Sequence, residues 1–271
     1  TALEQAIGRQ PTFMTVWIGN NDILGATLAA TPIDGVTMTP VDVFAGLYAN
    51  AIGALVTNTS ADIVLINIPD RLPFTTTLTP LVEIPGVGTI PLMADTGPLT
   101  ANDFVTLSAG ALIAQGYGLP GGPVLPDNLN LLTGEPGYVL RAAEAAAIEE
   151  RIAAYNQAIA QVADAYDLPV LDANALFRSY WTANAPRFGG TILTGEYLLG
   201  GIFSYDGIHQ QNIGYALIAN ALIELINDEL GGSIPLVNMI EVLYEGDWQS
   251  PGVTPFKAGE AVLSRAAFDQ L

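Results

Sequence analysis

The chain has 271 residues and 50% of them are hydrophobic, so it can bury a sizeable core and is not disordered as a whole. Its 27 acidic and 8 basic side chains give a formal charge of −19, which disfavours binding to nucleic acids and to anionic lipid headgroups and suits a high-salt or extracellular setting. Because it has no cysteine and a single histidine, His209, disulfides, cysteine nucleophiles and thiolate or histidine-rich metal sites are excluded, whereas calcium bound by carboxylates is not.

Three apolar segments are predicted to be strands. Residues 13–18 follow a short helix that ends at Gly8, and they carry apolar side chains on both faces, as strands inside a parallel sheet do. Residues 61–70 and residues 168–173 are the second and third predicted strands. No segment is predicted to span a membrane, because the longest uncharged stretch, residues 104–126, is too rich in glycine and proline.

Long helices are predicted between and after these strands. Residues 40–56 are helix-like, and residues 141–166 carry apolar side chains at steps of three and four, the spacing of one helix face. Residues 212–230 form the last predicted helix, which Gly231 and Gly232 end. Strands that alternate with long helices indicate an α/β fold, with a parallel sheet and helices on both of its faces.

Residues 71–137 differ from the rest of the chain, because they are rich in threonine, proline and glycine and only weakly periodic. The segment is too long for an ordinary connection, so we expect an insertion that borders a site. It lines an acyl pocket or forms a satellite core under a long loop, and the sequence favours neither. The apolar side chains on which both interpretations depend are Phe74, Leu78, Leu81, Val82, Ile84, Val87, Ile90, Leu92 and Met93.

The remaining segments show no firm periodicity. We expect a loop from the third strand to about Tyr205, and a C-terminal tail over residues 238–271 whose role the sequence does not indicate. No internal repeat and no clear second domain is visible.

The first predicted strand stops on four residues that disfavour strands, Gly19-Asn20-Asn21-Asp22. Open parallel sheets bind ligands beyond the carboxyl ends of their strands, so this is a position for a functional corner. There the amide of Asn21 can donate a hydrogen bond to a developing oxyanion. A tight polar turn is an equally good interpretation of these residues by themselves.

A second motif lies just before the last predicted helix, in the sequence "FSYDGIHQQNIGYA". Asp206 and His209 are three residues apart, which allows the carboxylate to hold the imidazole while the ring faces a cleft. A histidine so placed can act as general base, with the aspartate fixing its tautomer. A single histidine is usually structural, but both motifs together, in order and at the ends of predicted elements, favour catalysis.

These two motifs, G-x-N-D and D-x-x-H, resemble blocks III and V of the SGNH (GDSL-type) hydrolases. The surrounding sequences, "PTFMTVWIGNNDIL" and "GIFSYDGIHQQNIGYALIANALIELIN", are similar to the branch of exported bacterial GDSL-like lipases and acylhydrolases. The resemblance covers roughly residues 1–237, which we take as one SGNH hydrolase-like domain. It implies a flavodoxin-like, three-layer α/β/α sandwich and hydrolysis of ester bonds with neither a metal nor another cofactor.

The resemblance also implies roles for single residues. Asn21 becomes an oxyanion donor, His209 the general base and Asp206 the carboxylate that orients it, while Gly19 and Asp22 shape the turn. The exported branch implies a secreted or extracytoplasmic protein, with a lipid anchor possible in an N-terminal segment.

The sequence departs from the family at the nucleophile. The family's serine lies in block I, a G-D-S or G-N-S motif ahead of everything present here, and block II supplies a glycine donor; neither block is present. Of the serines, Ser108 comes closest to the required Gly-x-Ser context but lies in the insertion. None of the seven has that context: Ser60, Ser108, Ser179, Ser204, Ser233, Ser250 and Ser264.

We therefore expect the chain to be the C-terminal portion of a serine esterase or lipase-like acylhydrolase that acts on a small-molecule or lipid ester. An N-terminal segment, as a partner chain or as part of the same protein, is expected to supply the serine and the strand beside residues 13–18. Two alternatives remain: a non-catalytic binding or structural module on the same scaffold, and a carbohydrate O-deacetylase. A G-x-S motif upstream and a profile of acyl-chain lengths discriminate among the three.

Overall fold

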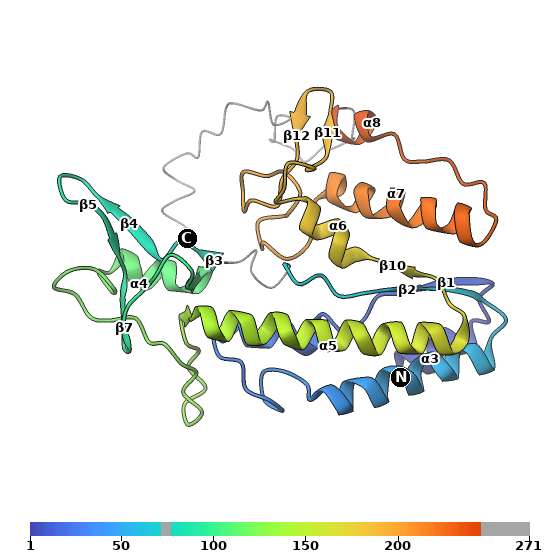
Figure 1. The fold of residues 1–271 in the computed structure, drawn as a ribbon, viewed down its shortest axis with the longest axis horizontal. Helices are drawn as coiled ribbons and strands as arrows, with labels where there is room; N and C mark the ends of the chain where they lie inside the picture. The colour runs from blue at the N-terminus through green and yellow to red at the C-terminus, as the bar shows by residue number, and fades with distance from the viewer. Residues whose placement is uncertain (72–76, 245–271) are drawn as a thin grey trace.

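The structure, a computed structural model, describes residues 1–71 and 77–244 (Figure 1). Phe74 of the predicted insertion, Ser250, Ser264 and residues 245–271 of the predicted tail lie outside the described residues. Within the described part, no helix combines the length and the apolar character needed to cross a membrane.

A parallel sheet of three strands forms the centre of the described residues, so the predicted α/β class is confirmed. Strand β2 (Asp62–Ile66) lies between β1 (Phe13–Val16) and β10 (Val170–Leu171). Residues 63–66 of β2 are all buried, as expected of a central strand.

The expectation that both faces of the first strand lie inside the sheet's helical layers is wrong. Strand β1 pairs with β2 along one edge, and among the described residues no strand pairs with its other edge. Phe13 is 39% exposed and Thr15 is also exposed, whereas Val16, which faces the opposite side, is buried. One face of the strand is thus open to solvent, and separately its outer edge has no partner strand among the described residues.

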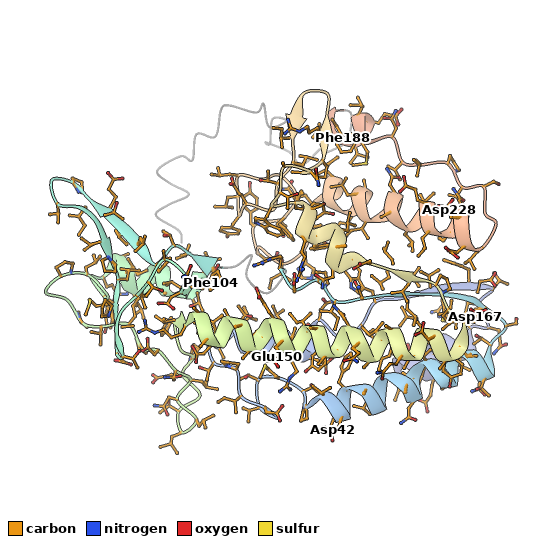
Figure 2. The ribbon with its side chains drawn as sticks, viewed as in Figure 1. Asp42, Phe104, Glu150, Asp167, Phe188 and Asp228 are labelled. Atoms are coloured by element: carbon orange, nitrogen blue, oxygen red, sulfur yellow. The ribbon has the colours of Figure 1, made fainter. Side chains whose placement is uncertain are left out.

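Helices lie on both sides of the sheet (Figure 1). Helices α3 (Val41–Asn58) and α5 (Ala142–Tyr166) pack on one side, and α6 (Ala173–Ser179) and α7 (Asn212–Glu229) on the other. The exposed Asp42, Glu150 and Asp228 lie on α3, α5 and α7 (Figure 2). The long predicted helices thus form because each has one apolar stripe to bury against the sheet.

Helix α5 follows the predicted periodicity closely. Its side chains Ile148, Ile152, Tyr155, Ile159 and Val162 are buried at steps of three and four residues. The Tyr155 ring stacks on Phe44 of α3 with the ring centroids 4.1 Å apart. This contact joins the two helices on one side of the sheet.

Several short elements were not predicted from the sequence. Four elements lie in segments without a predicted element: α2 (Asn21–Leu28), α8 (Met239–Tyr244), β11 (Arg187–Phe188) and β12 (Thr191–Ile192). Helix α1 (Ala2–Gly8) was expected. The predicted loop after the third strand begins instead with helix α6. The Asp172 side chain caps the first turn of this helix, because it accepts a hydrogen bond from the Ala175 N–H at 2.9 Å. These elements are too short for hydrophobic periodicity to reveal.

The predicted insertion contains short antiparallel strands. Strand β8 (Phe104–Thr106) lies between β3 (Thr77–Leu78) and β9 (Val139–Leu140). The hairpins β4–β5 and β6–β7 and two short helices complete it: β4 (Leu81–Ile84), β5 (Gly88–Pro91), β6 (Met93–Ala94), β7 (Gly97–Pro98), η2 (Leu107–Ala109) and α4 (Gly110–Ala114). Leu92, Val105, Leu125 and Val139 belong to a separate buried cluster, which corresponds to the satellite-core interpretation.

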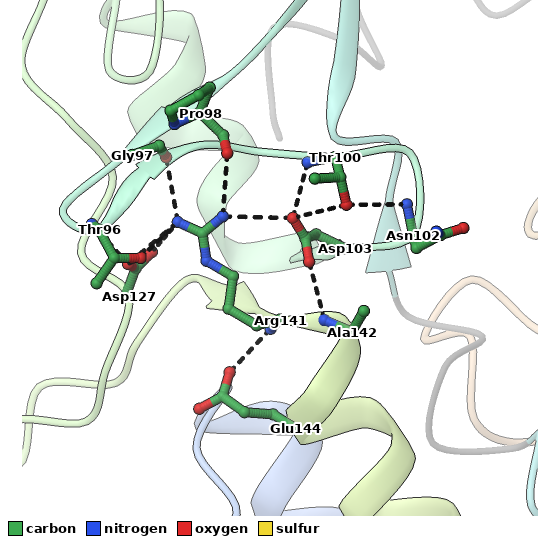
Figure 3. A network of polar contacts seen from close by, with 10 residues as sticks. All are labelled: Thr96, Gly97, Pro98, Thr100, Asn102, Asp103, Asp127, Arg141, Ala142 and Glu144. Carbon is green, nitrogen blue, oxygen red and sulfur yellow. Dashed lines mark hydrogen bonds and ion pairs between the residues drawn. The ribbon is translucent and has the colours of Figure 1, made fainter.

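Arg141, at the start of α5, ties the insertion to the rest of the fold (Figure 3). Its guanidinium contacts the carboxylates of Asp103 and Asp127, each at 3.3 Å, and both carboxylates are nearly completely buried. It also donates to the carbonyl oxygens of Gly97 and Pro98. Because Asp103 in turn accepts from the N–H of Ala142 at 2.8 Å, the same carboxylate caps α5.

We expect Arg141→Met to destabilise the protein by about 3 kcal/mol, because it leaves two buried carboxylates without their cation. Arg71→Met is the matched control: Arg71 pairs with Glu149 at 3.3 Å, but both side chains are about 40% exposed, so the loss should stay below about 1 kcal/mol. Urea unfolding measures both free energies. Equal losses in the two variants would contradict the role assigned to Arg141.

Candidate functional site

Gly19 forms the corner at the carboxyl end of β1. Its φ is +110°, a region that residues with a side chain rarely adopt. A Cβ atom there would lie 2.7 Å from Cδ1 of Ile68 and 2.9 Å from Cε2 of Phe44. Glycine is therefore required both by the backbone conformation and by the close packing of the neighbouring side chains.

The polar residues after this corner begin a helix. Asn20 is the N-cap of α2 and Asn21 is its first residue, so the strand passes directly into a helix that the sequence analysis did not predict. Asp22 points back into the fold: its Oδ1 accepts from Oγ1 of Thr39 at 2.7 Å, and its carbonyl oxygen accepts from the Thr39 N–H at 2.9 Å. Asp22 anchors the turn, and Asn21 remains exposed.

Asp206 and His209 are in direct contact. Nδ1 of His209 lies 2.7 Å from Oδ2 of Asp206, in the turn that precedes α7. The other carboxylate oxygen, Oδ1, accepts from Oγ of Ser204 at 2.6 Å and from the N–H groups of Ile208 and His209, each at 2.9 Å. Both oxygens are thus satisfied within six residues, and the imidazole is held in one orientation.

These contacts govern the ionisation of Asp206. Partial burial opposes the charged form, but hydrogen bonds from Ser204, from His209 and from the backbone outweigh it and hold the pKa of Asp206 below its ordinary value of 3.8. The aspartate is therefore ionised throughout the neutral range, as a carboxylate that stabilises an imidazolium has to be. The side chains of His209 and Asp206 are 71% and 49% exposed, so both are accessible from solvent.

One cavity of about 270 Å³ brings the two motifs together. Asn21 and His209 both line it, although 188 positions separate them in the chain, from residue 21 to residue 209. Most of the remaining wall is apolar or aromatic. The lining residues are Trp17, Asn20, Asn21, Ile23, Leu24, Ile208, His209, Gln210 and Tyr215.

The sequence analysis missed the apolar residues of this site. Trp17 and Tyr215 belong to a predicted strand and a predicted helix, and nothing in their spacing indicated that they face a cavity. Exposed apolar groups also lie in the loop before Asp206: Leu199 is 73% exposed and Tyr205 is 79% exposed. The Tyr197 hydroxyl donates to the carbonyl oxygen of Tyr205 at 2.7 Å and thereby joins this loop to the turn that holds the catalytic candidates.

Among the described residues, no serine hydroxyl is hydrogen-bonded to the His209 ring, which contacts Asp206. The hydroxyl of Ser204 donates to Asp206 instead. Ser108, the closest candidate by sequence, pairs with the hydroxyl of Thr106 at 2.9 Å in the insertion. Within residues 1–71 and 77–244, no cluster of three or more acidic or histidine side chains is arranged to hold a metal ion.

Comparison with known proteins gives no family assignment: no protein-family model and no curated protein matches the chain. The chemistry of the site has to be judged from its own geometry. The imidazole of His209 and the exposed amide of Asn21 line one largely apolar cavity, and the ionised carboxylate of Asp206 orients the imidazole.

We expect the carboxyl group of Asp206 to titrate below the ordinary aspartate range, and we expect Ser204→Ala to raise its pKa because one hydrogen bond to the charged form is lost. An acid with a lowered pKa contributes stability above its unfolded pKa, and this contribution disappears as the pH falls through the folded pKa. Carbon-13 NMR titration of the aspartates measures both midpoints. An unchanged midpoint in Ser204→Ala would rule out the assigned hydrogen bond.

Proposed function

We propose that the chain carries the histidine, aspartate and oxyanion-donor part of a serine ester hydrolase related to the SGNH hydrolases. The observation that carries this proposal is the 2.7 Å contact between Asp206 and His209 in a turn beside a cavity that Asn21 also lines. The parallel sheet with helices on both sides is compatible with the flavodoxin-like, three-layer sandwich that the resemblance implies.

In the proposed reaction, a serine hydroxyl attacks the carbonyl carbon of the ester. Nε2 of His209, the ring nitrogen that does not contact Asp206, takes the serine proton, and Asp206 stabilises the resulting imidazolium. The amide of Asn21 donates to the oxyanion of the tetrahedral intermediate. His209 returns the proton to the leaving alcohol and then activates the water that hydrolyses the acyl-enzyme.

The serine is proposed to come from a segment outside these 271 residues. The open edge of β1 supports this proposal, because a strand added there in parallel would end beside Gly19, close to the wall that Asn21 and His209 share. The partly exposed Phe13 would then be covered. Secretion of such a protein is part of the proposal and agrees with its strongly acidic surface.

The wall of the cavity favours an apolar acyl or alcohol group in the substrate. Its volume of about 270 Å³ is just below the range of roughly 300–1,000 Å³ that is typical of ligand pockets. The cavity is therefore suited to part of an ester, with the remainder along the exposed Leu199 and Tyr205.

Carbohydrate O-deacetylation is a second candidate, because a second cavity of about 610 Å³ is lined by aromatic, arginine and hydroxyl side chains. Trp181 and Tyr197 line it together with Arg71 and Arg178. Rings with one apolar face and nearby polar groups suit a sugar, whose faces are apolar and whose edge is polar. The two substrate classes are distinguished by comparing the rates of hydrolysis of esters of increasing acyl length with those of acetylated sugars.

In the complete enzyme, we expect His209→Ala to abolish ester hydrolysis because the general base is lost. Asn21→Ala should lower kcat by about 10²–10³-fold, the usual effect of removing one oxyanion donor. Asp206→Ala should have an intermediate or smaller effect, since an orienting carboxylate is partly dispensable. Release of p-nitrophenol from short-chain esters measures all three.

An asparagine far from the cavity provides the control for these variants. Asn102 is exposed in the insertion, so Asn102→Ala should retain the parent kcat. Full activity in His209→Ala would eliminate the proposed role of the histidine.

We also expect the open edge of β1 to be paired in the complete protein. The Asp62 N–H donates to the carbonyl oxygen of Thr12 at 3.0 Å, so even-numbered residues of β1 face β2 and the N–H of Thr15 faces the open edge. Hydrogen exchange at Thr15 should be slow in the complete protein and fast in the isolated 271-residue chain at concentrations at which it is monomeric.

The isolated chain should further be inactive and should associate along this edge. Sedimentation measures the association, and mass spectrometry identifies an accompanying segment. A monodisperse 28.4 kDa monomer with rapid exchange at Thr15 and undiminished stability would show that the edge needs no partner strand.

A further inference from the structure

The most exposed large apolar side chain of the described residues, Leu132, lies at the tip of one loop. Leu132 is 97% exposed and its neighbour Leu131 is 66% exposed, in the loop of residues 127–137 within the predicted insertion. Two adjacent leucines directed into water gain nothing from folding, and large apolar side chains exposed together mark interaction sites. The loop is separate from the residues that line the cavity of Asn21 and His209.

This tip is held in shape by its own polar groups. The side-chain oxygen of Asn130 accepts from the N–H groups of Leu132 and Thr133 at 3.0 and 3.2 Å. The backbone of Asn130 donates to the Glu135 carbonyl at 2.8 Å and accepts from the Gly134 N–H at 2.7 Å. The two leucines are therefore presented by a closed turn that needs no further ordering before it binds.

A second apolar tip is rooted beside the first. The hydroxyl of Thr31 accepts from the Leu129 N–H at 2.7 Å, and its carbonyl oxygen accepts from the hydroxyl of Thr37 at 2.6 Å. Thr31 thus joins the loop of residues 127–137 to the turn of residues 33–38, where Val36 is 61% exposed. Figure 1 shows both loops on the same side of α5, the lower side in that view.

The size and shape of these tips indicate what they bind. A stable protein partner needs roughly 1,200–2,000 Å² of buried surface, far more than three projecting side chains supply. A projecting tip of leucine and valine fits a soft apolar phase better than the concave surface of another protein. The formal charge of −19 disfavours an anionic surface, so the phase should be zwitterionic or uncharged.

We propose that the tips formed by Leu131, Leu132 and Val36 anchor the protein on the surface of zwitterionic or uncharged lipid. The choice of lipid rests on the proposed function, because an apolar ester substrate would reside in such a phase. The anchoring itself requires no catalysis.

Flotation of the full polypeptide with phosphatidylcholine vesicles tests the proposal. The parent should float with the vesicles, and more weakly with phosphatidylglycerol vesicles because of its negative charge. The double substitution of Leu131→Ser and Leu132→Ser should weaken vesicle binding at least about tenfold, the effect of withholding two leucines from an apolar phase. Val87→Ser is the matched control: Val87 is 69% exposed at the β4–β5 turn and should not affect flotation.

Fluorescence provides a second measurement, in which vesicle binding produces a new signal in a variant that keeps an apolar side chain at the tip. Trp emission should shift to shorter wavelength on adding phosphatidylcholine vesicles to Leu132→Trp, and the corresponding shift should be absent in Val87→Trp. A parent that does not float, or a double serine variant that floats as well as the parent, overturns the proposal. In the complete enzyme, hydrolysis of a water-soluble ester should be equal in the parent and in both serine variants, so failure of the proposed function is recorded separately.

Discussion

The corner that presents Asn21 depends on one constraint, the close packing of Gly19 between β1 and α2. The backbone at φ +110° and the contacts with Ile68 and Phe44 leave no room for a side chain. The chain must therefore turn sharply from the strand into a helix, and this turn leaves the next residues at the carboxyl edge of the sheet. Asn21 is exposed there because Asp22 is held inward by Thr39.

The two motifs of the site are positioned in different ways. The carboxylate and the imidazole are fully positioned by local hydrogen bonds around Asp206, so this part needs nothing from β1. Under the proposed function, a serine carried by an added strand would reach the site from the edge of β1 that is unpaired among the described residues. Hydrogen bonds within one turn thus position His209, whereas in the proposed enzyme the pairing of strands would position the serine.

Electrostatics limit the fold in a different way. A chain with 27 acidic and 8 basic side chains has few cations with which to compensate buried carboxylates. Arg141 neutralises Asp103 and Asp127 together, and Arg178 binds the buried Asp70. The pairs of Arg141 with Asp103 and of Arg178 with Asp70 join residues 38 and 108 positions apart. The buried carboxylates of the insertion, which would destabilise the fold without a cation, thus attach the insertion to the start of α5.

The sequence by itself determined the features that arise from local periodicity and from short motifs. The burial of α5 follows from apolar spacing, and the contact of Asp206 with His209 from their separation of three residues in a turn. Only the tertiary structure decided the exposure of Phe13 and the common cavity of Asn21 and His209. These depend on which strands are neighbours and on which side chains meet across them, and contacts between distant residues leave no periodic trace in one sequence.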